Sequence, residues 1–426
     1  MKFFVFSLGC KVNSYEKDAI KEALIERGDV EVSKPEEASL IVVNTCSVTA
    51  TSDQKSRQHI RKFRRLSPNA IVAVMGCYSE GHLSEAETLG ADIIIGTSGR
   101  DKLLSYIDQF AVDHKQIVDV TYLDRKKKYE ELKSNAFTDN ARAYLKIQDG
   151  CDKFCSYCLI PFVRGNSRSR TKEEALREAK ALVEKGYQEL VLTGIEVGFY
   201  GLDLYGKEYG LGELVEDIIK ENPTLKRLRL SSIDISEISD KLFEDFKNYQ
   251  ALMPHLHLSL QSGSDSVLKR MKRNYTTSEY YEKVKLLRSM CPDIAITTDI
   301  IAGFPEETDE EWNETMEFAK KCEFAEIHCF AYSSRKGTVA ASMKQVDSAT
   351  KDKRSHELLA LSRELRDKYE KKFYGQEMEV LFEDYDSKSG YTYGHTKNYL
   401  LVKKKSDRSL QKTFATVIYD ESSKAD

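Results

Sequence analysis

Short apolar runs alternate with amphipathic stretches along the first part of the chain. Four of these runs have the length of buried strands: residues 3–7, 40–43, 70–75 and 92–95. Helical periodicity fills residues 14–27 and 51–66, between the runs. Strands separated by helices are typical of a parallel sheet, so residues 1–120 are predicted to form a parallel α/β domain.

A second alternation follows a polar, charged stretch at residues 121–138, which we interpret as a linker. Six runs in it are expected to be strands: residues 143–148, 189–193, 227–231, 257–261, 295–301 and 326–332. Helical segments lie between them, for example at residues 172–185 and 278–289. Such repeats over residues 139–370 predict a partial (β/α)6 barrel, with its chemistry at the carboxyl ends of the strands.

The pattern changes again after a charged amphipathic helix at residues 351–374. The runs that follow are typical of short strands: residues 378–382, 390–396, 399–402 and 414–418. Residues 371–426 are therefore predicted to form a small β-barrel. The expected fold class is α/β, with an N-terminal parallel α/β domain, a central partial barrel and this C-terminal β domain.

Composition limits the kind of protein further. The chain has 426 residues, of which 41% are hydrophobic and 31% charged, and its formal net charge is −4. These values exclude a disordered or fibrous chain and a strongly basic protein, although local basic patches can still bind nucleic acid. There is no run of 18 apolar residues, and the first residues read as a strand rather than an export signal. We therefore expect a cytoplasmic protein with no membrane partner.

Three cysteines of the N-terminal region share one kind of position, directly after an expected strand. They are Cys10, Cys46 and Cys77. The carboxyl ends of parallel strands meet at one edge of a sheet, so three thiols there could share a metal ion or a cluster. The alternative is that they are three small buried side chains, since a free cysteine is often part of a core.

The strongest chemical signal is the segment GCDKFCSYC, directly after the first expected barrel strand. Its cysteines are Cys151, Cys155 and Cys158, in the spacing C-x3-C-x2-C. Three thiolates so close together can bind three irons of a [4Fe-4S] cluster and leave the fourth iron open for another ligand. A structural zinc site normally has four protein ligands, and neither a second cysteine pair nor a histidine lies nearby in the sequence.

This motif, placed after the first strand of a barrel, resembles that of the radical S-adenosylmethionine (SAM) superfamily. The resemblance implies that the open iron binds SAM and that an electron from the cluster cleaves it to a 5′-deoxyadenosyl radical. It also implies SAM contacts from Tyr157 in the motif and from residues at the carboxyl ends of later strands. These residues are Thr193, Gly194, Ser231, Ser232, Gln261, Asp299 and Gly303.

The order of the three predicted domains resembles that of the methylthiotransferases, a family within this superfamily, over essentially the whole chain. The resemblance implies that Cys10, Cys46 and Cys77 hold a second [4Fe-4S] cluster, which carries the sulfur to the substrate. All six cysteines would then be catalytic. A second SAM would supply the methyl group, and the C-terminal domain would be a TRAM domain that binds RNA.

Subgroups of this family differ in substrate. The segments LGCKVNSYE and NTCSVT resemble the subgroup that acts on N6-threonylcarbamoyladenosine in tRNA. That resemblance implies methylthio insertion at carbon 2 of the adenine next to the anticodon, with tRNA as partner and a reductant such as flavodoxin or ferredoxin. Two alternatives keep the chemistry but change the substrate, to isopentenyladenosine in tRNA or to an aspartate of a ribosomal protein. A more distant alternative is a zinc-stabilised RNA-binding protein without catalysis.

Basic side chains near the cluster motif are candidates for contact with RNA. In the segment RGNSRSR, Arg164, Arg168 and Arg170 follow the cluster loop, and we interpret them as substrate contacts. The lysine runs at residues 126–128 and 403–405 fit either RNA binding or an ordinary solvated surface. Phosphate contacts of this kind would weaken binding as salt rises.

Overall fold

The N-terminal part of the chain is a parallel sheet. The computed structural model describes residues 1–121, 127–132, 140–406 and 409–425. Its first sheet has the strand order β2-β1-β3-β4-β5-β6, and neighbouring strands are parallel. The strands are β1 (Lys2–Ser7), β2 (Val30–Glu31), β3 (Leu40–Thr45), β4 (Ile71–Gly76), β5 (Ile93–Ile95) and β6 (Ile117–Asp119). The predicted parallel α/β architecture is therefore confirmed.

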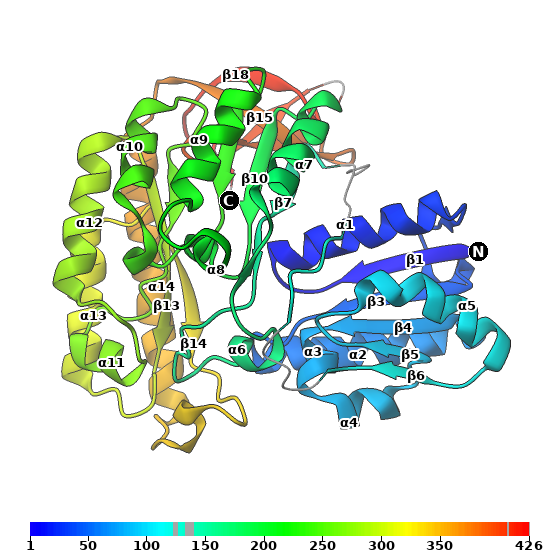
Figure 1. The fold of residues 1–426 in the computed structure, drawn as a ribbon. Coiled ribbons are helices and arrows are strands. Elements are labelled where there is room, and N and C mark those ends of the chain that lie inside the picture. The colour runs from blue at the N-terminus through cyan, green and yellow to red at the C-terminus, as the bar shows by residue number, and fades with distance from the viewer. Residues whose placement is uncertain (122–126, 133–139, 407–408, 426) are drawn as a thin grey trace.

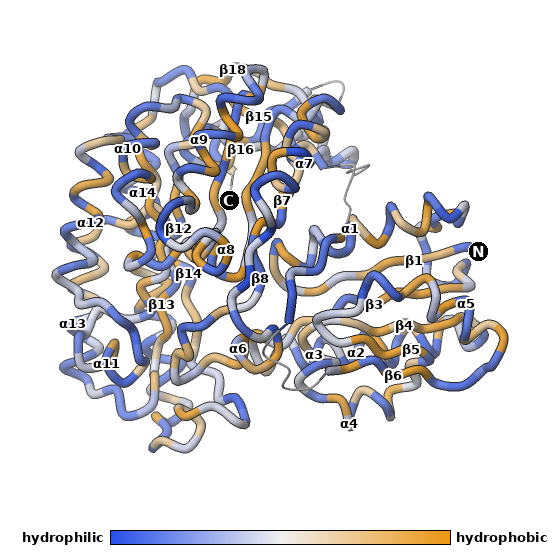
Figure 2. Tube along the Cα trace, in the orientation of Figure 1, coloured by the Kyte–Doolittle hydropathy of each residue, from blue (hydrophilic) through white to orange (hydrophobic). Residues whose placement is uncertain are grey.

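Helices cover both faces of this sheet. Helices α1 (Lys11–Glu26) and α5 (Leu103–Asp113) pack on one face. Helix α2 (Ala50–Leu66), with the short helices α3 (Cys77–Gly81) and α4 (Leu83–Ala86), covers the other. Strands β3 and β4 are buried at every position, as expected for a doubly covered sheet, and Figure 2 shows how hydrophobic this region is. The carboxyl ends of the strands face the central part of the molecule (Figure 1).

The central part is an open barrel of parallel strands, built from two three-stranded sheets (Figure 1). The isolated bridges Leu228–Leu252 and Ile233–Leu258 join the two sheets in chain order. The strands are β7 (Ala143–Lys146), β10 (Glu189–Thr193), β11 (Arg227–Leu230), β12 (His255–His257), β13 (Ala295–Ala302) and β14 (Glu326–Ala331). The longer helices outside the barrel are α7 (Lys172–Glu184), α9 (Leu211–Glu221), α10 (Asp240–Asn248), α12 (Thr277–Met290), α13 (Asp309–Cys322) and α14 (Ser348–Lys371). This arrangement confirms the predicted partial barrel.

Alternation along the barrel strands separates an apolar outer face from a polar inner face. Leu190 and Leu192 of β10 belong to the hydrophobic core that packs against the helices, so Glu189 lies on the opposite, inner face. The same alternation places Arg229 of β11 and His257 of β12 on the inner face. The interior of the barrel is therefore suited to a polar ligand.

An excursion between β7 and α7 carries the cluster motif. It contains the paired strands β8 (Gln148–Asp149) and β9 (Arg168–Ser169) and the short helix α6 (Ile160–Val163). Two further short helices, α8 (Leu202–Tyr205) and α11 (Asp265–Arg270), come after β10 and β12. These segments lie beyond the carboxyl ends of the strands, where the chemistry of a barrel is expected.

The fourth barrel strand lies earlier in the chain than its sequence pattern predicts. Strand β12 ends at His257, whereas the sequence predicts a strand at residues 257–261. Leu258 and Gln261 form only isolated bridges. Gln261 has a φ of 69°, in the left-handed region, and such a residue interrupts an extended strand.

The predicted linker is partly packed against the N-terminal domain. Within its described residues, 127–132, the Lys127 ammonium lies 2.9 Å from Glu80, and Leu132 packs near Tyr15. Lys127 is therefore buried in an ion pair rather than free for RNA. Residues 122–126 and 133–138 of the linker, which include Lys126, lie outside the described residues.

The C-terminal part is a curled antiparallel sheet in the order β17-β16-β15-β18. Its strands are β15 (Glu377–Asp386), β16 (Tyr391–Thr396), β17 (Leu401–Lys405) and β18 (Phe414–Ile418). The sheet covers the amino ends of the barrel strands, because Arg227 and Arg229 of β11 donate to main-chain oxygens of His395 and Thr396. Across the ranges that the structure describes, no helix is both long enough and apolar enough to cross a membrane.

Candidate active site

The structure brings the first three cysteines to one edge of the N-terminal sheet. Cys10 precedes α1, Cys46 follows β3, and Cys77 begins α3 directly after β4. A Cβ atom placed on Gly9 would lie 2.8 Å from the Cys46 sulfur, so glycine is needed for this close approach. Burial raises the pKa of the Cys77 thiol to about 12. Positive charge is therefore needed to hold this group as a thiolate.

Arg164 supplies such a charge from the central domain. Its Nε atom donates to the Cys77 sulfur at 3.2 Å, and its Nη2 atom donates to Asn13 at 2.9 Å. Its Nη1 atom lies 3.0 Å from Glu16 and 2.9 Å from Asp149. Arg164 is fully buried. It therefore joins the two domains beside the first trio of cysteines.

The interpretation of three arginines as substrate contacts is corrected by their burial. Arg164 pairs with Glu16 and Asp149, as described above. Arg168 pairs with Asp149 at 3.1 Å, and Arg170 pairs with Glu178. Both side chains are almost fully buried. Because internal carboxylates already bind these guanidinium groups, they are not available to RNA phosphates in this structure.

The second trio of cysteines lies in the loop between β8 and α6. Gly150, just before Cys151, has a φ of 70°, and a Cβ atom there would lie 1.9 Å from the Asn166 carbonyl oxygen. Arg273 donates to the Cys155 sulfur at 3.4 Å, and the amide of Ile160 donates to the Cys158 sulfur at 3.4 Å. Burial raises the pKa of the Cys158 thiol to about 12. The positive charge of bound iron would lower this pKa and hold Cys158 as a thiolate.

The sulfurs of each cysteine trio are not all as close together as the ligands of a single zinc ion. In a tetrahedral zinc site with zinc–sulfur bonds of 2.3 Å, sulfurs lie about 3.8 Å apart. Among the described residues, ligand atoms of His257, Asp299 and His328 all lie within 4.8 Å of one another. The three sulfurs of neither cysteine trio meet this limit. Both trios are thus set wider than a single ion requires, which fits the larger [4Fe-4S] cluster.

A cavity of about 180 Å³ lies between the barrel and the N-terminal domain. Tyr157, Gln261 and Asp299, all expected to contact SAM, line it together. Val48 and Thr49, which follow Cys46, form part of the opposite wall. The cavity therefore brings part of the expected SAM site close to the segment that carries one of the first trio of cysteines.

The other residues expected to contact SAM lie at strand ends but are partly used by the fold. Ser231 donates to the Leu192 oxygen, and a Cβ atom on Gly194 would lie 2.8 Å from the Gln148 side chain. The buried Thr193 hydroxyl has no hydrogen-bond partner in the described part of the chain. The remaining two are Ser232, which is half-buried, and Gly303, whose amide donates to Glu307 at 2.8 Å.

Glu196 is a half-buried carboxyl group that the sequence analysis missed. It follows Thr193 and Gly194, and its charge acts on Cys151. Its Oε1 atom accepts from the amide of Asp234 at 3.0 Å. Burial, with the charge of Asp234, raises the pKa of Glu196 to about 7. A carboxylate shortly after a barrel strand is the sequence signal that could have identified it.

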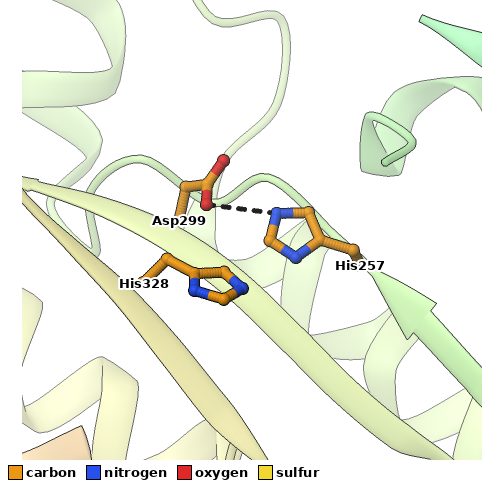
Figure 3. A group of neighbouring side chains, drawn as sticks. All are labelled: His257, Asp299 and His328. Carbon is orange, nitrogen blue, oxygen red and sulfur yellow. Dashed lines mark ion pairs between the residues drawn. The ribbon is translucent and has the colours of Figure 1, made fainter. Parts of the chain in front are cut away.

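The polar trio of His257, Asp299 and His328 lies on neighbouring strands of the inner wall (Figure 3). His257 Nε2 is 3.2 Å from Asp299 Oδ1, and His257 Nδ1 is 3.0 Å from the Thr297 hydroxyl. Asp299 therefore has a partner on β12 in addition to the cavity that it lines. The trio thus adds polar groups to the barrel interior beside the cavity that Asp299 lines.

Known proteins share both halves of this arrangement. Residues 145–319 match the radical SAM superfamily, and residues 2–96 match a family described as uncharacterized protein family UPF0004. The structure resembles the radical SAM methyltransferase TsrM from Kitasatospora setae, with a TM-score of 0.60 and 13% identity over 80% of this chain and 74% of that one. At this identity the likeness concerns the fold alone.

Curated relatives match almost the whole chain. The threonylcarbamoyladenosine tRNA methylthiotransferase MtaB of Bacillus subtilis is 42% identical over 93% of this chain and 88% of its own length. The tRNA-2-methylthio-N(6)-dimethylallyladenosine synthase of Geobacillus thermodenitrificans is 33% identical over 90% of this chain and 73% of its own length. With its radical SAM barrel and its two cysteine trios, this chain belongs to the methylthiotransferase family of radical SAM enzymes.

Proposed function

We propose that this protein inserts a methylthio group at carbon 2 of the adenine of N6-threonylcarbamoyladenosine, next to the anticodon of tRNA. The observation that carries the proposal is the 42% identity, over 93% of the chain, to an enzyme named for that substrate. The relative named for the dimethylallyl substrate is less similar, at 33%.

Each trio of cysteines is proposed to hold one [4Fe-4S] cluster. Cys151, Cys155 and Cys158 would hold the cluster that binds SAM, and the second trio is Cys10, Cys46 and Cys77. When bound, the two clusters and SAM supply a radical that can take hydrogen from an unreactive aromatic carbon, and the sulfur that replaces it. The wide spacing of the sulfurs supports clusters rather than zinc.

Two arginines position cysteine side chains and offset the negative charge of their thiolates. Arg273 lies against Cys155, and Arg164 lies against Cys77. Asp234 forms an ion pair with Arg273 and lies 3.0 Å from Lys153, so it fixes both side chains in the cluster loop region. These guanidinium groups offset the negative charge of thiolates, which burial otherwise disfavours.

Two features of the structure also support RNA as the substrate. An adenine must leave its stack to reach a buried site, and the cavity between the domains is lined by chain neighbours of Cys46 and Cys158. We assign RNA binding to the TRAM-like C-terminal domain, where Lys403, Lys404 and Lys405 lie on β17. A reductant such as flavodoxin or ferredoxin would supply electrons in the cytoplasm.

Two cysteine variants test the proposal with one assay. The protein is reconstituted without oxygen and given SAM and a synthetic anticodon stem-loop that carries N6-threonylcarbamoyladenosine. Cys151→Ala should abolish both 5′-deoxyadenosine and the methylthio product. Cys46→Ala should keep SAM cleavage and lose the product, and Cys291→Ala, outside both trios, serves as the control. Methylthio product from the Cys46 variant, or from the isopentenyl stem-loop alone, would contradict the proposal.

A further inference from the structure

The inner wall of the barrel carries more positive than negative groups where it faces α1. Glu189 of β10 is shared by three guanidinium groups, at 2.8 Å from Arg229, 3.5 Å from Arg227 and 3.6 Å from Arg142. Glu383 of the C-terminal sheet gives Arg142 a second partner at 2.9 Å. Glu379 lies 3.3 Å from Arg227, so three carboxylates match these three arginines, and any further cation in this region gives it a net positive charge.

Lys11 adds a cation that has no carboxylate of its own. It begins α1, directly after Cys10, and is half-buried. The charges of Arg142 and Arg229 act on it, so it lies on the same side of the barrel interior. Among the residues described, no carboxylate forms an ion pair with Lys11, whereas Lys17 and Lys21 on the same helix each have one.

A second polar group in this region, the imidazole of His255, also lacks a hydrogen-bond partner among the described residues at one of its nitrogens. His255, on the inner face of β12, is 4% exposed, and its Nδ1 atom has no hydrogen-bond partner in the described chain. The charges of Arg229 and Lys11 act on its ring, and Tyr399 of the C-terminal domain stacks on it. Two unsatisfied polar groups from different domains therefore share one environment, although buried polar groups are normally paired.

The substrate of the proposed function contains a group that complements this environment. The threonyl part of N6-threonylcarbamoyladenosine ends in a carboxylate and carries a hydroxyl group. The isopentenyl group of the alternative substrate is apolar. Burying an apolar group against an unpaired ammonium would leave the ammonium without a partner, which is costly.

The geometry of adenine makes the position of Lys11 appropriate. Carbon 2 and the N6 substituent flank the same ring nitrogen, N1, so the substituent lies on the edge of the base that reacts. A group that binds the threonyl carboxylate must therefore lie near the residues that act at carbon 2. Lys11 meets this condition because it adjoins Cys10.

Resting on the proposed function, we propose that Lys11, which adjoins Cys10 and shares the charged surroundings of Arg229 and His255, binds the threonyl carboxylate of the substrate base and thereby selects it over apolar N6 substituents. Lys11 supplies the charge, and His255 is placed to bond to the carboxylate or the hydroxyl. In this arrangement the helix that follows Cys10 positions the base as well as the cysteine.

Binding of stem-loop RNA tests this inference without catalysis. The reconstituted protein is titrated with two RNAs, one with N6-threonylcarbamoyladenosine and one with its methyl ester, which removes only the charge. Wild-type protein should prefer the acid by about tenfold or more, as a charged hydrogen bond allows. Equal binding of acid and ester by the wild type would overturn the inference, whatever the variants do.

Three variants localise the effect. Lys11→Gln should abolish the preference for the acid, and Lys11→Arg should restore it. Lys17→Gln makes the same change of charge further along α1, where Lys17 pairs with Asp18, and should keep the preference. Iron content and SAM cleavage show that each variant is folded and loaded. A Lys11→Gln protein that still prefers the acid would overturn the inference.

The outcome is separable from that of the proposed function. If the wild type methylthiolates the threonylcarbamoyl RNA but does not distinguish acid from ester, the inference fails and the proposed function stands. If the wild type modifies only the isopentenyl RNA, the proposed function fails as well.

Discussion

Arg164 is the residue on which the contact between the two cysteine-bearing domains depends most directly. Its guanidinium group contacts Glu16 and Asn13 of the N-terminal domain, Asp149 of the central domain and the sulfur of Cys77. A buried charge with this many partners leaves several groups unpaired when it is removed.

We predict that Arg164→Ala lowers the free energy of unfolding by about 3 kcal/mol, because two buried carboxylates, Glu16 and Asp149, each lose one of their partners. Denaturant unfolding with and without iron measures the change. Arg177→Ala removes an exposed arginine that pairs with Glu174 and should cost less than about 1 kcal/mol. Equal effects of the two substitutions would show that Arg164 is not a structural link.

The sequence identifies the cysteines of this site but not the role of its arginines. The cysteines could be found because close spacing and strand-end positions are properties of the chain itself. Arg164, Arg168 and Arg170 could not be assigned in the same way, because an arginine near a cluster loop looks alike whether RNA or a buried carboxylate is its partner. Glu16, a partner of Arg164, lies far away in sequence, so only the fold reveals that pairing.

At the scale of elements, the loop between β8 and α6 depends on one backbone position. Gly150 precedes Cys151 in a left-handed conformation, and the Asn166 oxygen occupies the place of a side chain. Any larger residue must push β9 and its neighbours away from the cysteines.

We predict that Gly150→Ala prevents one of the two clusters from forming, so that the protein holds about half of the wild-type iron. Iron and sulfide analysis of the reconstituted protein checks this. Gly186→Ala is the matched control, because Gly186 also has a positive φ, of 97°, but nothing lies within 4 Å of the added Cβ atom. Full iron in the Gly150 variant would refute this account of the loop.

Helices and strands were predictable where the hydrophobic pattern is long and uninterrupted. The buried β3 and β4 strands follow directly from their apolar runs. Strand β12 was misplaced because the run continues past His257, and the left-handed conformation of Gln261 is imposed by tertiary contacts rather than by its type. Short strands at the sheet edges, such as β2, carry too few residues to show a pattern.

At the scale of the whole molecule, buried ion pairs connect the N-terminal and central domains. Glu16 of α1 lies 3.0 Å from Arg164 and 3.2 Å from Lys146. Arg335, after β14, pairs with Asp53 of α2 at 2.7 Å. The cavity between the domains therefore depends on carboxylates that must stay ionised.

Acid should separate the two domains through Glu16. Burial alone would raise the pKa of this carboxyl group, but the charges of Arg100 and Arg164 lower it below its ordinary value of about 4.3. The stability that ionised Glu16 contributes is therefore complete above pH of about 4.3 and is lost as pH falls through the lowered pKa.

Thermal unfolding between pH 7 and pH 3 tests this prediction. Glu16→Gln should be less stable than the wild type at neutral pH, and the difference should shrink toward pH 3. Glu31→Gln, at an exposed pair with Lys21, should follow the wild-type curve. A constant difference at every pH would show that Glu16 does not contribute through its charge.

The most direct test of the function is mass spectrometry of nucleosides from total tRNA, compared between cells with and without this gene. We expect that 2-methylthio-N6-threonylcarbamoyladenosine disappears without the gene and that its precursor, N6-threonylcarbamoyladenosine, accumulates. Restoring the gene should restore the product, whereas a copy with Cys46→Ala should not. Unchanged levels of both nucleosides, or loss of the isopentenyl product instead, would contradict it.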